Sequence, residues 1–337
     1  MKLLYLLLLI KVAMATQLPH RNHSCVPSAY TQMCILEHLQ YKPDKEHMIH
    51  SFPPNRSHVR ITTESRSSGR VVEMIEINAK LHTLLGKPKI LEMYGYAMWN
   101  FELPRALWKG IFSKSHIFNL TVEPGTETPR VVYLDLSSNY LSDIANVSSL
   151  VNLEVLILSY NHISSIDATT MQNLTKLRIL DLSHNFLLMV PMNIFPKSLT
   201  HLNLFACYIQ SLNYDHLYYP SMEVLIVERN KLTSIDSTAL MRAMPKLRKV
   251  RLGWNLFDLE ELQEALQQFR QHNVSFRDEA DEAACAFAQQ VVEGVCIRGP
   301  APPRSFIREI QLSLVVLVIA IALGVSIRWV YSVIQAK

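Results

Sequence analysis

The stretch VVYLDLSSNYL, residues 131–141, decides the fold of this 337-residue chain. Apolar residues occupy its positions 1, 4, 6 and 11, and an asparagine occupies position 9. The same spacing returns in LEVLILSYNHI (153–163), LRILDLSHNFL (177–187), MEVLIVERNKL (222–232) and LRKVRLGWNLF (247–257). One such unit cannot bury its own apolar face, so the units are expected to stack into a solenoid.

A sixth unit lies within SLTHLNLFACYIQSL, residues 198–212, where Cys207 takes the place of the asparagine. The second apolar position then falls at 134, 156, 180, 202, 225 and 250, in steps of 22, 24, 22, 23 and 25 residues. Pattern and period match the leucine-rich repeat L-x-x-L-x-L-x-x-N/C-x-L. We therefore expect an α/β fold, a curved solenoid with a parallel sheet on its concave side and helix-like returning segments on its convex side.

The asparagine of each unit is expected to satisfy backbone groups where the coil turns out of its strand. Cysteine is tolerated there as a small, buried, weak donor, so we interpret Cys207 as structural and inert. The other four cysteines allow three pairings. We predict the local pairs Cys25–Cys34 and Cys285–Cys296, because one pair lies on each side of the repeats, where the ends of a solenoid need closing.

The chain begins with MKLLYLLLLIKVAMAT, which has the layout of a secretory signal peptide over residues 1–15. A lysine precedes a short apolar core, and Ala13-Met14-Ala15 is a small-x-small cleavage site. A retained anchor is the alternative interpretation. The mature chain is expected to begin near Thr16, in an oxidising compartment where disulfides persist.

The other end of the chain contains a run of 18 uncharged residues, long enough to span a bilayer. We predict a transmembrane helix over 310–331, a cytoplasmic tail over 332–337 and, given the signal peptide, a single-pass type I protein of the plasma membrane. A lipid anchor attached in the Pro-rich stalk, residues 299–309, is the alternative. The charges of Arg328 and Lys337 argue against that anchor.

Glycosylation and charge also fit an ectodomain. N-x-[ST] acceptors stand at Asn22, Asn55, Asn119, Asn146, Asn173 and Asn273. Each is a weak signal alone, but together with the signal peptide they predict a glycoprotein. The net charge of +4 is modest and gives no basis for a nucleic-acid partner.

The regions flanking the regular repeats are weaker in pattern. The predicted organisation is 1–15 signal peptide, 16–70 N-terminal cap, 71–130 degenerate coils, 131–257 regular repeats, 258–298 C-terminal cap, 299–309 stalk, 310–331 transmembrane helix and 332–337 tail. Within the cap, HVRITTE (58–64) is expected to add an edge strand. The amphipathic segment 258–273 is expected to form a capping helix, since it is too short for a coiled coil.

The degenerate coils are expected to contribute two or three strands, in VVEMIEI (71–77), ILEMYGY (90–96) and HIFNLTV (116–122), which alternate but lack the asparagine. Only 14 residues separate Leu120 from Leu134, too few for a full coil. An insertion in this region is the alternative.

No catalytic motif of the hydrolase, metalloprotease, nucleotide-binding or dinucleotide-binding kind occurs in the sequence. His47 and His50 have ligand-like spacing but no third ligand at a zinc spacing. Asp135 and Asp181 share one column of the predicted sheet but stand two repeats apart, with Ile157 between them, too far for paired acid–base work. We therefore expect neither an enzyme nor a cofactor or metal.

A concave surface is what this fold offers. In the predicted columns that point out of the sheet, apolar side chains are expected to form a contiguous band at Val155, Ile157, Ile179, Phe205, Val224 and Ile226, with Tyr160 and Trp254 at its edge. Exposed apolar patches of this kind mark interaction sites. Basic residues follow at the C-terminal end of the same face: Arg229, Arg248, Lys249 and Arg251. The alternatives are that a cap or glycan covers the band, or that the strands are merely rich in β-branched residues.

The chain resembles a known family in three features: the Cys25-x8-Cys34 element with a short strand after it, the weak early coils, and the regular DLSSNYL and DLSHNFL repeats. These resemble the leucine-rich immune proteins of mosquitoes. Secreted members of that family pair through a long C-terminal coiled coil and hold complement-like thioester proteins. This chain lacks that coiled coil and looks like a transmembrane branch, so a thioester protein is a partner by resemblance only.

We therefore predict a membrane-anchored extracellular leucine-rich repeat protein of innate immune recognition, or a co-receptor, that binds a protein partner on its concave face. The alternative function is a cell-adhesion or developmental co-receptor without an immune role. Both share one fold, and a fold alone does not decide between them.

Overall fold

The computed structural model describes residues 20–22, 24–26, 33–37, 39, 41, 49–52, 56–62, 76–277 and 290–297. All of them belong to one compact unit, Met1–Ile297. The predicted signal peptide, stalk, membrane segment and tail lie outside the described residues. Among the residues that are described, no helix is both long and apolar enough to cross a membrane.

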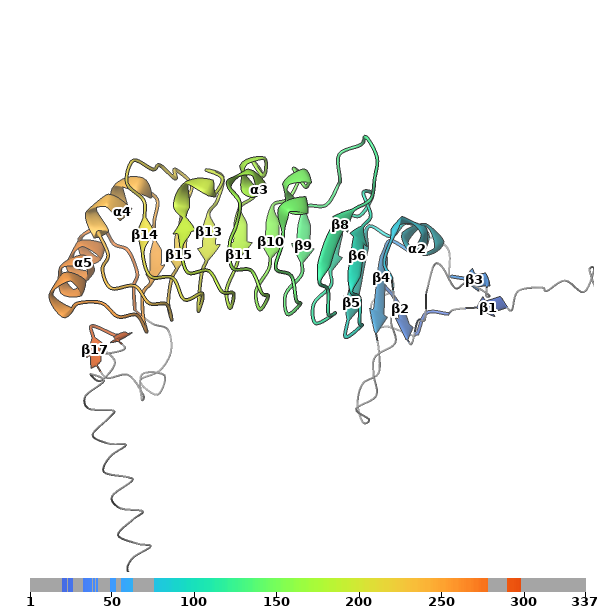
Figure 1. The fold of residues 1–337 in the computed structure, drawn as a ribbon, viewed down its shortest axis with the longest axis horizontal. Coiled ribbons are helices and arrows are strands. Elements are labelled where there is room, and N and C mark those ends of the chain that lie inside the picture. Colours follow the sequence, from blue (N-terminus) through green and yellow to red (C-terminus); the bar gives the residue numbers. More distant parts are fainter. Residues whose placement is uncertain are drawn as a thin grey trace, which may run out of the picture. The chain divides into compact units, whose positions relative to one another are not determined.

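A single parallel sheet runs through the described unit (Figure 1). Its ten strands follow the order β16-β15-β13-β11-β10-β9-β7-β5-β4-β2. Their bounds are β2 Met33–Glu37, β4 His58–Thr62, β5 Ile90–Tyr94, β7 Lys109–Ile111, β9 Tyr133–Asp135, β10 Val155–Ile157, β11 Ile179–Asp181, β13 His201–Asn203, β15 Val224–Ile226 and β16 Lys249–Arg251. Each strand pairs with the strand of the next coil, as a leucine-rich repeat solenoid requires.

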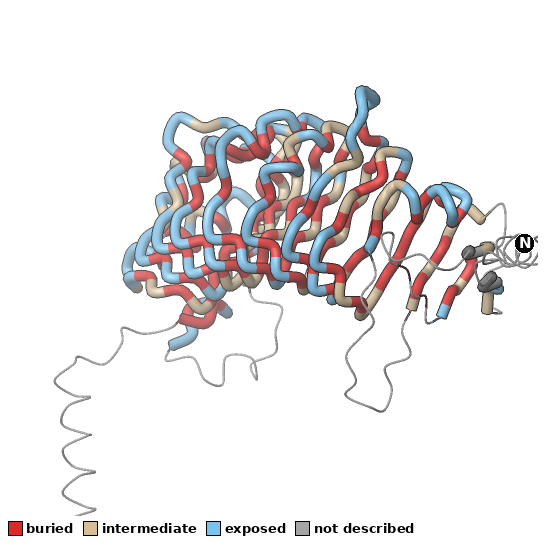
Figure 2. The backbone as a smooth tube through the Cα atoms, turned by 45° about the vertical axis from the view of Figure 1, so that its right-hand side comes forward, coloured by how far each residue is buried: buried red, intermediate tan, exposed pale blue. Residues whose placement is uncertain are grey.

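The leucine pattern places the core. The middle residues Leu134, Leu156 and Leu180 lie opposite one another in β9, β10 and β11, and none is exposed. The two residues flanking each of them point to the other face and are half-buried or exposed, as the period of two in a strand demands. Figure 2 shows buried segments repeating from coil to coil along the unit.

Buried asparagines connect each coil to the one before it. The Nδ2 amide of Asn161 donates to the carbonyls of Leu136, Leu158 and Ser159, and its Oδ1 accepts from the backbone N–H of Leu141. The same set of contacts recurs at Asn139, Asn185, Asn230 and Asn255. Backbone groups that leave the strands are thus satisfied without water.

Cys207 fills the asparagine position of its coil only in part. Its thiol donates to the carbonyl of Leu182 at 3.1 Å and lies 3.5 Å from that of Phe205. Burial raises the pKa of the Cys207 thiol to about 11, which keeps it neutral. A thiol lacks the amide oxygen, and the N–H of Leu187, which would donate to that oxygen, makes no hydrogen bond to Cys207 in the described structure.

One coil was missed by the sequence interpretation. Leu120 does not hold the strand position before Leu134, because its strand lies in a separate small sheet. The preceding coil is LWKGIFSKSHI, 107–117, in which Gly110 pairs with Leu134 and Ser115 takes the asparagine position. The 24 residues from Gly110 to Leu134 are a full coil.

Gly110 replaces the expected leucine because aromatic rings fill its space. A Cβ atom at Gly110 would lie 2.5 Å from Phe112 Cε2 and 3.2 Å from Leu134 Cδ1. The ring of Phe112 packs against that of Phe101 with their centroids 4.4 Å apart. Volume lost at one position is therefore supplied by a neighbour, which keeps the packing dense.

The N-terminal end of the sheet also differs from expectation. β4, within HVRITTE, is not an edge strand, because β2 pairs with its outer side. β2 is the outermost strand of the described sheet and carries Cys34, which is bonded to Cys25 as predicted. The disulfide therefore holds the chain against the last strand, where an open sheet edge would otherwise invite pairing with another chain.

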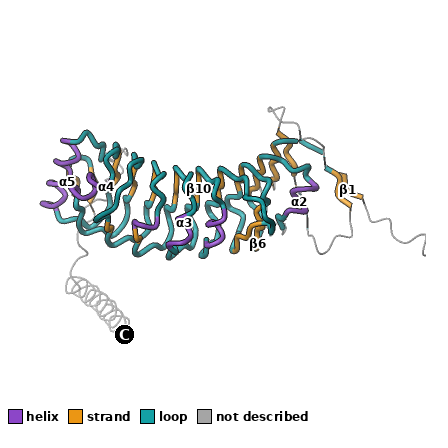
Figure 3. The backbone as a smooth tube through the Cα atoms, turned by 90° about the horizontal axis from the view of Figure 1, so that it is seen from above, coloured by secondary structure: helices purple, strands orange, loops and turns teal. Residues whose placement is uncertain are grey.

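Short elements cover the other side of the coils (Figure 3). The helices are α2 Ala79–Leu84, α3 Ala168–Gln172 and α4 Ser237–Ala243, with 3₁₀ turns η2 Ala145–Ser149 and η3 Met192–Ile194. Small parallel pairs join β6 Asn100–Leu103 to β8 Asn119–Val122 and β12 Val190–Pro191 to β14 Leu212–Asn213. In the cap, β1 His20–Asn22 pairs with β3 Ile49–Ser51.

The C-terminal end is closed by the helix that the sequence predicts. α5, Leu259–Gln271, begins at Asp258, whose carboxylate accepts from the N–H groups of Glu260 and Glu261. Its buried face carries Leu262, Ala265, Leu266 and Phe269. The hairpin β17 Gln290–Val292 and β18 Val295–Ile297 follows. Cys296 is disulfide-bonded, while Cys285 lies outside the described residues, so its predicted pairing stays a prediction.

Candidate protein-binding surface

The sheet face is the surface formed by the side chains that point out of β9 to β16. Strand register places its members in two columns: Tyr133, Val155, Ile179, His201, Val224 and Lys249 in the first, and Asp135, Ile157, Asp181, Asn203, Ile226 and Arg251 in the second. These are the columns that the sequence predicts.

Within these two columns, the residues of the predicted apolar band fall into two patches, and Phe205, the remaining member of the band, follows β13 between them. Val155, Ile157 and Ile179 form one apolar patch on β10 and β11, and Val224 and Ile226 form a second on β15. β13 lies between them and places His201 and Asn203 in the same columns. Contiguity of the band across β13 therefore depends on Phe205 and stays a prediction.

A row of strained backbone positions runs along the end of the sheet. The residue before each asparagine position has φ between +53° and +59°, at Lys114, Ser138, Tyr160, His184, Ala206, Arg229 and Trp254. Non-glycine residues seldom adopt this conformation. Here it is held because each N–H donates to the next coil, as Tyr160 does to the carbonyl of Ser183 and Arg229 to that of Gly253.

Four of these positions carry side chains of a stacked row, and Phe205, next to Ala206, is its fifth member. We call this row of Tyr160, His184, Phe205, Arg229 and Trp254 the π row. The rings of Tyr160 and His184 are stacked with centroids 3.9 Å apart, and those of His184 and Phe205 are 5.0 Å apart. Arg229 Cζ lies 5.7 Å from the Phe205 ring and 5.3 Å from the Trp254 ring. Aromatic stacking and cation–π contacts thus fix five neighbouring side chains in place.

Sequence interpretation named four of these five residues and missed His184. It placed Phe205 in the band, Tyr160 and Trp254 at its edge, and Arg229 among the basic residues of the same face. Phe205 belongs to the row because small Ala206 holds the left-handed position in that coil, which leaves room for the ring beside it. The available signal was the position directly before each asparagine, where bulky side chains recur at Tyr160, His184, Arg229 and Trp254.

A second row follows two positions beyond the left-handed positions of the π row, on the other side of each asparagine. Phe118, Tyr140, His162, Phe186 and Tyr208 form it, with successive ring centroids 4.8 to 6.0 Å apart. Lys231 Nζ completes it, 5.2 Å from the Tyr208 ring. Sequence interpretation missed this row as well, although its members stand directly after the asparagine positions in most coils.

The N-terminal strands of the sheet carry a closed polar network. Glu92, only 6% exposed, accepts from Arg60 at 2.7 Å and lies 2.8 Å from His58 Nε2. Burial alone raises the pKa of the Glu92 carboxyl, but the hydrogen bonds and charges of Arg60 and His58 outweigh it, and the net pKa is lowered. Tyr94 donates to the same carboxylate, and burial beside that charge raises its pKa to about 12.

The basic residues at the C-terminal end differ in exposure. Arg229 and Arg248 are exposed, Lys249 is half-buried and Arg251 is buried. Among the described residues, the side chain of Arg229 makes two cation–π contacts, and no carboxylate pairs with it. Of these four residues, Arg229 is thus the one whose guanidinium lies over two rings without a described counter-ion.

The acidic residues of the second column accept hydrogen bonds from the backbone two residues further along the chain. Asp135 accepts from the N–H of Ser137 at 2.9 Å, and Asp181 accepts from that of Ser183 at 2.8 Å. Ile157 lies between them in the register, as the sequence indicates. Within the described residues no group of three metal-ligating side chains is present. His47 lies outside the described residues, and so does the side chain of His50.

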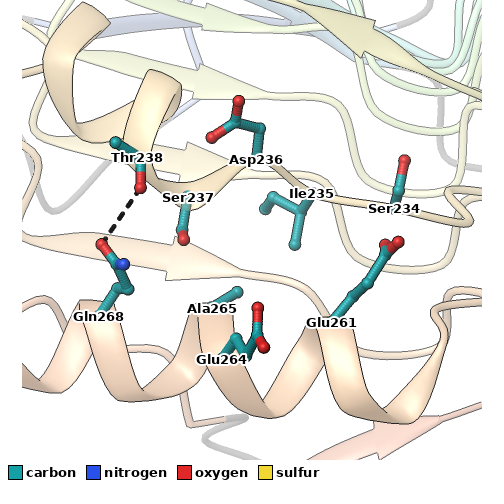
Figure 4. Close-up of a pocket in the computed structure, with 9 residues that line it drawn as sticks. All are labelled: Ser234, Ile235, Asp236, Ser237, Thr238, Glu261, Glu264, Ala265 and Gln268. Carbon is teal, nitrogen blue, oxygen red and sulfur yellow. Dashed lines mark hydrogen bonds between the residues drawn. The ribbon is translucent and has the colours of Figure 1, made fainter.

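One polar hollow lies away from the sheet face (Figure 4). It has a volume of about 310 Å³ and is lined by Ser234–Thr238, before and at the start of α4, and by four residues of α5. Asp236 caps α4 by accepting from Ala239, and Thr238 reaches Gln268 at 3.4 Å. Its acidic side chains therefore have a structural use at Asp236, and nothing else in the hollow indicates a ligand.

Four of the glycosylation acceptors fall in described segments. Asn119, Asn146, Asn173 and Asn273 are exposed, and none of them lies on a strand of the main sheet. The side chain of Asn22 and all of Asn55 lie outside the described residues. The sheet face thus carries no acceptor among the described residues.

These features define a leucine-rich repeat fold whose sheet face is bordered by stacked aromatic side chains. A model of the leucine rich repeat family matches residues 129–187. Toll-like receptor 2 of Equus caballus is 26% identical over 223 residues, covering 57% of this chain and 28% of the receptor. Tsukushi of Gallus gallus is 40% identical over 106 residues, covering 29% of this chain and 26% of Tsukushi.

A solved structure, the leucine-rich repeat domain of APL1B, overlaps at a TM-score of 0.52 with 16% identity, covering 75% of this chain and 72% of that one. At this identity the likeness concerns the fold alone. The chain spans about a quarter of the length of the first curated relatives, 28% of Toll-like receptor 2 and 25% of nephrocan from Mus musculus.

Proposed function

We propose that this chain is an extracellular, membrane-anchored binding protein that recognises a protein partner on its sheet face, in innate immune recognition or as a co-receptor. The observation that carries the proposal is the π row beside the two apolar patches. Protein-binding surfaces are enriched in aromatic and arginine side chains, and hot spots concentrate on such residues.

The geometry supports binding in a second way. Stacking and left-handed backbone hold the π row in one conformation before any partner arrives. A surface that is already ordered loses less side-chain entropy on association, so more of the contact energy appears as affinity. The immune role draws further support from the likeness to Toll-like receptor 2, and the membrane anchor from the uncharged run near the C-terminus.

The binding test uses the full chain displayed on cells. Body fluid and solubilised cell-surface proteins of the source animal are applied, and the captured proteins are compared between wild type and the pair Phe205→Asp with Ile226→Asp. We expect the pair to lose the captured partner. The matched control is Gln172→Asp with Asn193→Asp, two exposed residues on α3 and η3. It should capture as well as wild type.

Because Phe205 and Ile226 are half-buried, thermal unfolding of both variants is measured alongside. A folded Phe205/Ile226 variant that captures the partner as wild type does would overturn the proposed surface. Release of the chain by phospholipase C would overturn the transmembrane anchor in favour of a lipid anchor. Induction of the protein by microbial challenge supports the immune role, and constant expression at cell junctions would favour adhesion instead.

A further inference from the structure

Arg229 stands out among the cations of the sheet face. Its guanidinium lies between the rings of Phe205 and Trp254, at 5.7 and 5.3 Å from their centroids. Its backbone is fixed by the hydrogen bond from its N–H to the carbonyl of Gly253. The residue is nevertheless exposed, and no carboxylate of the described residues pairs with it. Both ends of this side chain are thus held while its charge remains open to a partner.

A guanidinium held in this way is organised for one kind of contact. Its planar fork of N–H donors matches a carboxylate or a phosphate in a bidentate arrangement, and stacking on aromatic faces leaves those donors at its edge. The rings beside it are stacked face to face or tilted within the row, so they present their electropositive edges as well. The site favours an anionic group.

The surroundings select the source of that group. Asp135 and Asp181 lie in the second column of the same face, so a polyanion such as a sulfated glycan or an anionic membrane that extended from Arg229 along the sheet toward β9 would meet like charges there. Ile226 and Val224 lie three and five residues before Arg229 in the same coil and are apolar. A single carboxylate flanked by apolar side chains complements this arrangement, and acidic protein segments supply such groups.

We propose that Arg229, clamped between Phe205 and Trp254, is the anchor for an aspartate or glutamate of a protein partner whose neighbouring apolar side chains cover Val224 and Ile226. This inference rests on the proposed function, because it names the chemistry that the sheet face recognises. The acidic residue supplies specificity, and the apolar contacts supply buried area.

The test uses a displayed library of random twelve-residue peptides, selected on the full-length chain in membranes. Enriched peptides are expected to carry an aspartate or glutamate next to apolar residues. Arg229→Met keeps the aliphatic stem between the rings and removes the charge, so it should weaken these peptides about tenfold or more. Arg229→Lys should lose affinity as well, because ammonium lacks the planar fork.

The matched control is Lys231→Met. Lys231 also lies over an aromatic ring, that of Tyr208, but in the second row, two residues further along the same coil. Its removal should leave peptide affinity unchanged. Equal losses in Arg229→Met and Lys231→Met would indicate a general charge effect and would overturn the proposal.

Two further probes separate the alternatives. Heparin and vesicles containing phosphatidylserine are tested on wild type and Arg229→Met, and little binding to Arg229 is expected for either. Arg229-dependent binding of these probes without enriched acidic peptides would contradict the proposal. So would a selection that enriches no sequence, or peptides that ignore Arg229→Met. Peptides that ignore that change but fail on the Phe205/Ile226 pair would leave the proposed function standing.

Discussion

The coils before and after residue 130 share one sheet but are held together by different side chains. In the later coils, buried asparagines repeat one set of hydrogen bonds from Asn139 to Asn255. In the earlier coils, Ser115 and Tyr96 take that position. Tyr96 donates to the carbonyl of Thr62 instead. The common feature is the backbone register, which tolerates several solutions to the same demand for paired polar groups.

The outward-facing charged side chains of the two regions differ in whether they are already paired within the protein. In the earlier coils, His58, Arg60 and Tyr94 surround the Glu92 carboxylate, so its charge is compensated within the protein. In the later coils, the π row stacks side by side and leaves Arg229 without a carboxylate partner among the described residues. Under the proposed function, the closed network of the N-terminal strands contributes to stability and the open π row of the C-terminal strands contributes to recognition.

The largest expected effect is the removal of one asparagine from the later coils. Asn161→Ala leaves the carbonyls of Leu136 and Leu158 and the N–H of Leu141 without their partners. We expect the free energy of unfolding to fall by about 3 kcal/mol, since buried unpaired groups are costly. Urea denaturation measures it. The exposed Asn193→Ala should change stability by less than about 0.5 kcal/mol, and a similar loss there would contradict the comparison.

Adding a side chain at Gly110 is expected to lower the free energy of unfolding by overpacking the earlier coils. Gly110→Ala brings a Cβ atom to 2.5 Å from Phe112, and overpacking of this kind costs about 1–3 kcal/mol. Thermal unfolding measures the loss. Adding Phe112→Leu should recover part of it by opening space. If Gly110→Ala is neutral, the account of ring-filled space in this coil is wrong.

Neutralising Glu92 probes the closed polar network. Glu92→Gln removes the charge that pairs with Arg60, and we expect a loss of about 1–2 kcal/mol at pH 7. Because the folded pKa of Glu92 is lowered, this contribution is fully present above the unfolded pKa of glutamate and disappears as the pH falls through the folded pKa. Urea denaturation from pH 7 to pH 3 follows it.

The control for that series is Glu154→Gln, an exposed carboxylate that should show neither the loss nor its pH dependence. A difference between wild type and Glu92→Gln that stays constant down to the lowest pH would argue against a lowered pKa.

Cys207 allows the opposite experiment, in which a regular coil is completed. Cys207→Asn should restore the acceptor for the N–H of Leu187 and three donor contacts, and raise the free energy of unfolding by about 1 kcal/mol. Cys207→Ala should lower it. If the asparagine variant were no more stable than the alanine variant, the coil around Cys207 would not accommodate the hydrogen bonds that asparagine makes in the other coils.

The reactivity of Cys207 gives the smallest and simplest prediction. The thiol is fully buried and its pKa is raised to about 11, so native protein at pH 8 should resist thiol reagents at this residue. Stability should also decline as the pH rises from the unfolded thiol pKa of about 9 toward 11, since the unfolded state then loses the proton first. Rapid native labelling of Cys207 would contradict its structural role.

Much of the fold could be predicted from the sequence because leucine spacing fixes both the register and the core. The repeats over 131–257, the capping helix α5 and the Cys25–Cys34 bond all follow from local patterns. The coil at 107–117 was missed because Gly110 and Ser115 break the pattern at two positions at once. Only the volume of Phe112, seen in three dimensions, explains the first of them.

The site was less predictable, for a physical reason. Residues that flank the leucines were assigned to the correct face, but contacts between coils depend on backbone conformation as well as on spacing. The left-handed position before each asparagine swings Tyr160, His184 and Arg229 into one row, and no pattern of hydrophobicity carries that information. By contrast, His201 and Asn203 lie between the two apolar patches in the columns that the leucine spacing predicts.

Site-specific photo-crosslinking tests the central claim, partner binding on the sheet face, most directly. A photoreactive phenylalanine is placed at Ile179, which is 39% exposed on β11, and separately at exposed Asn193 on η3, in the full chain on cells. The account predicts a crosslinked partner protein from position 179 and none from position 193. Crosslinking from position 193 alone would place the partner on the helix side and contradict the account.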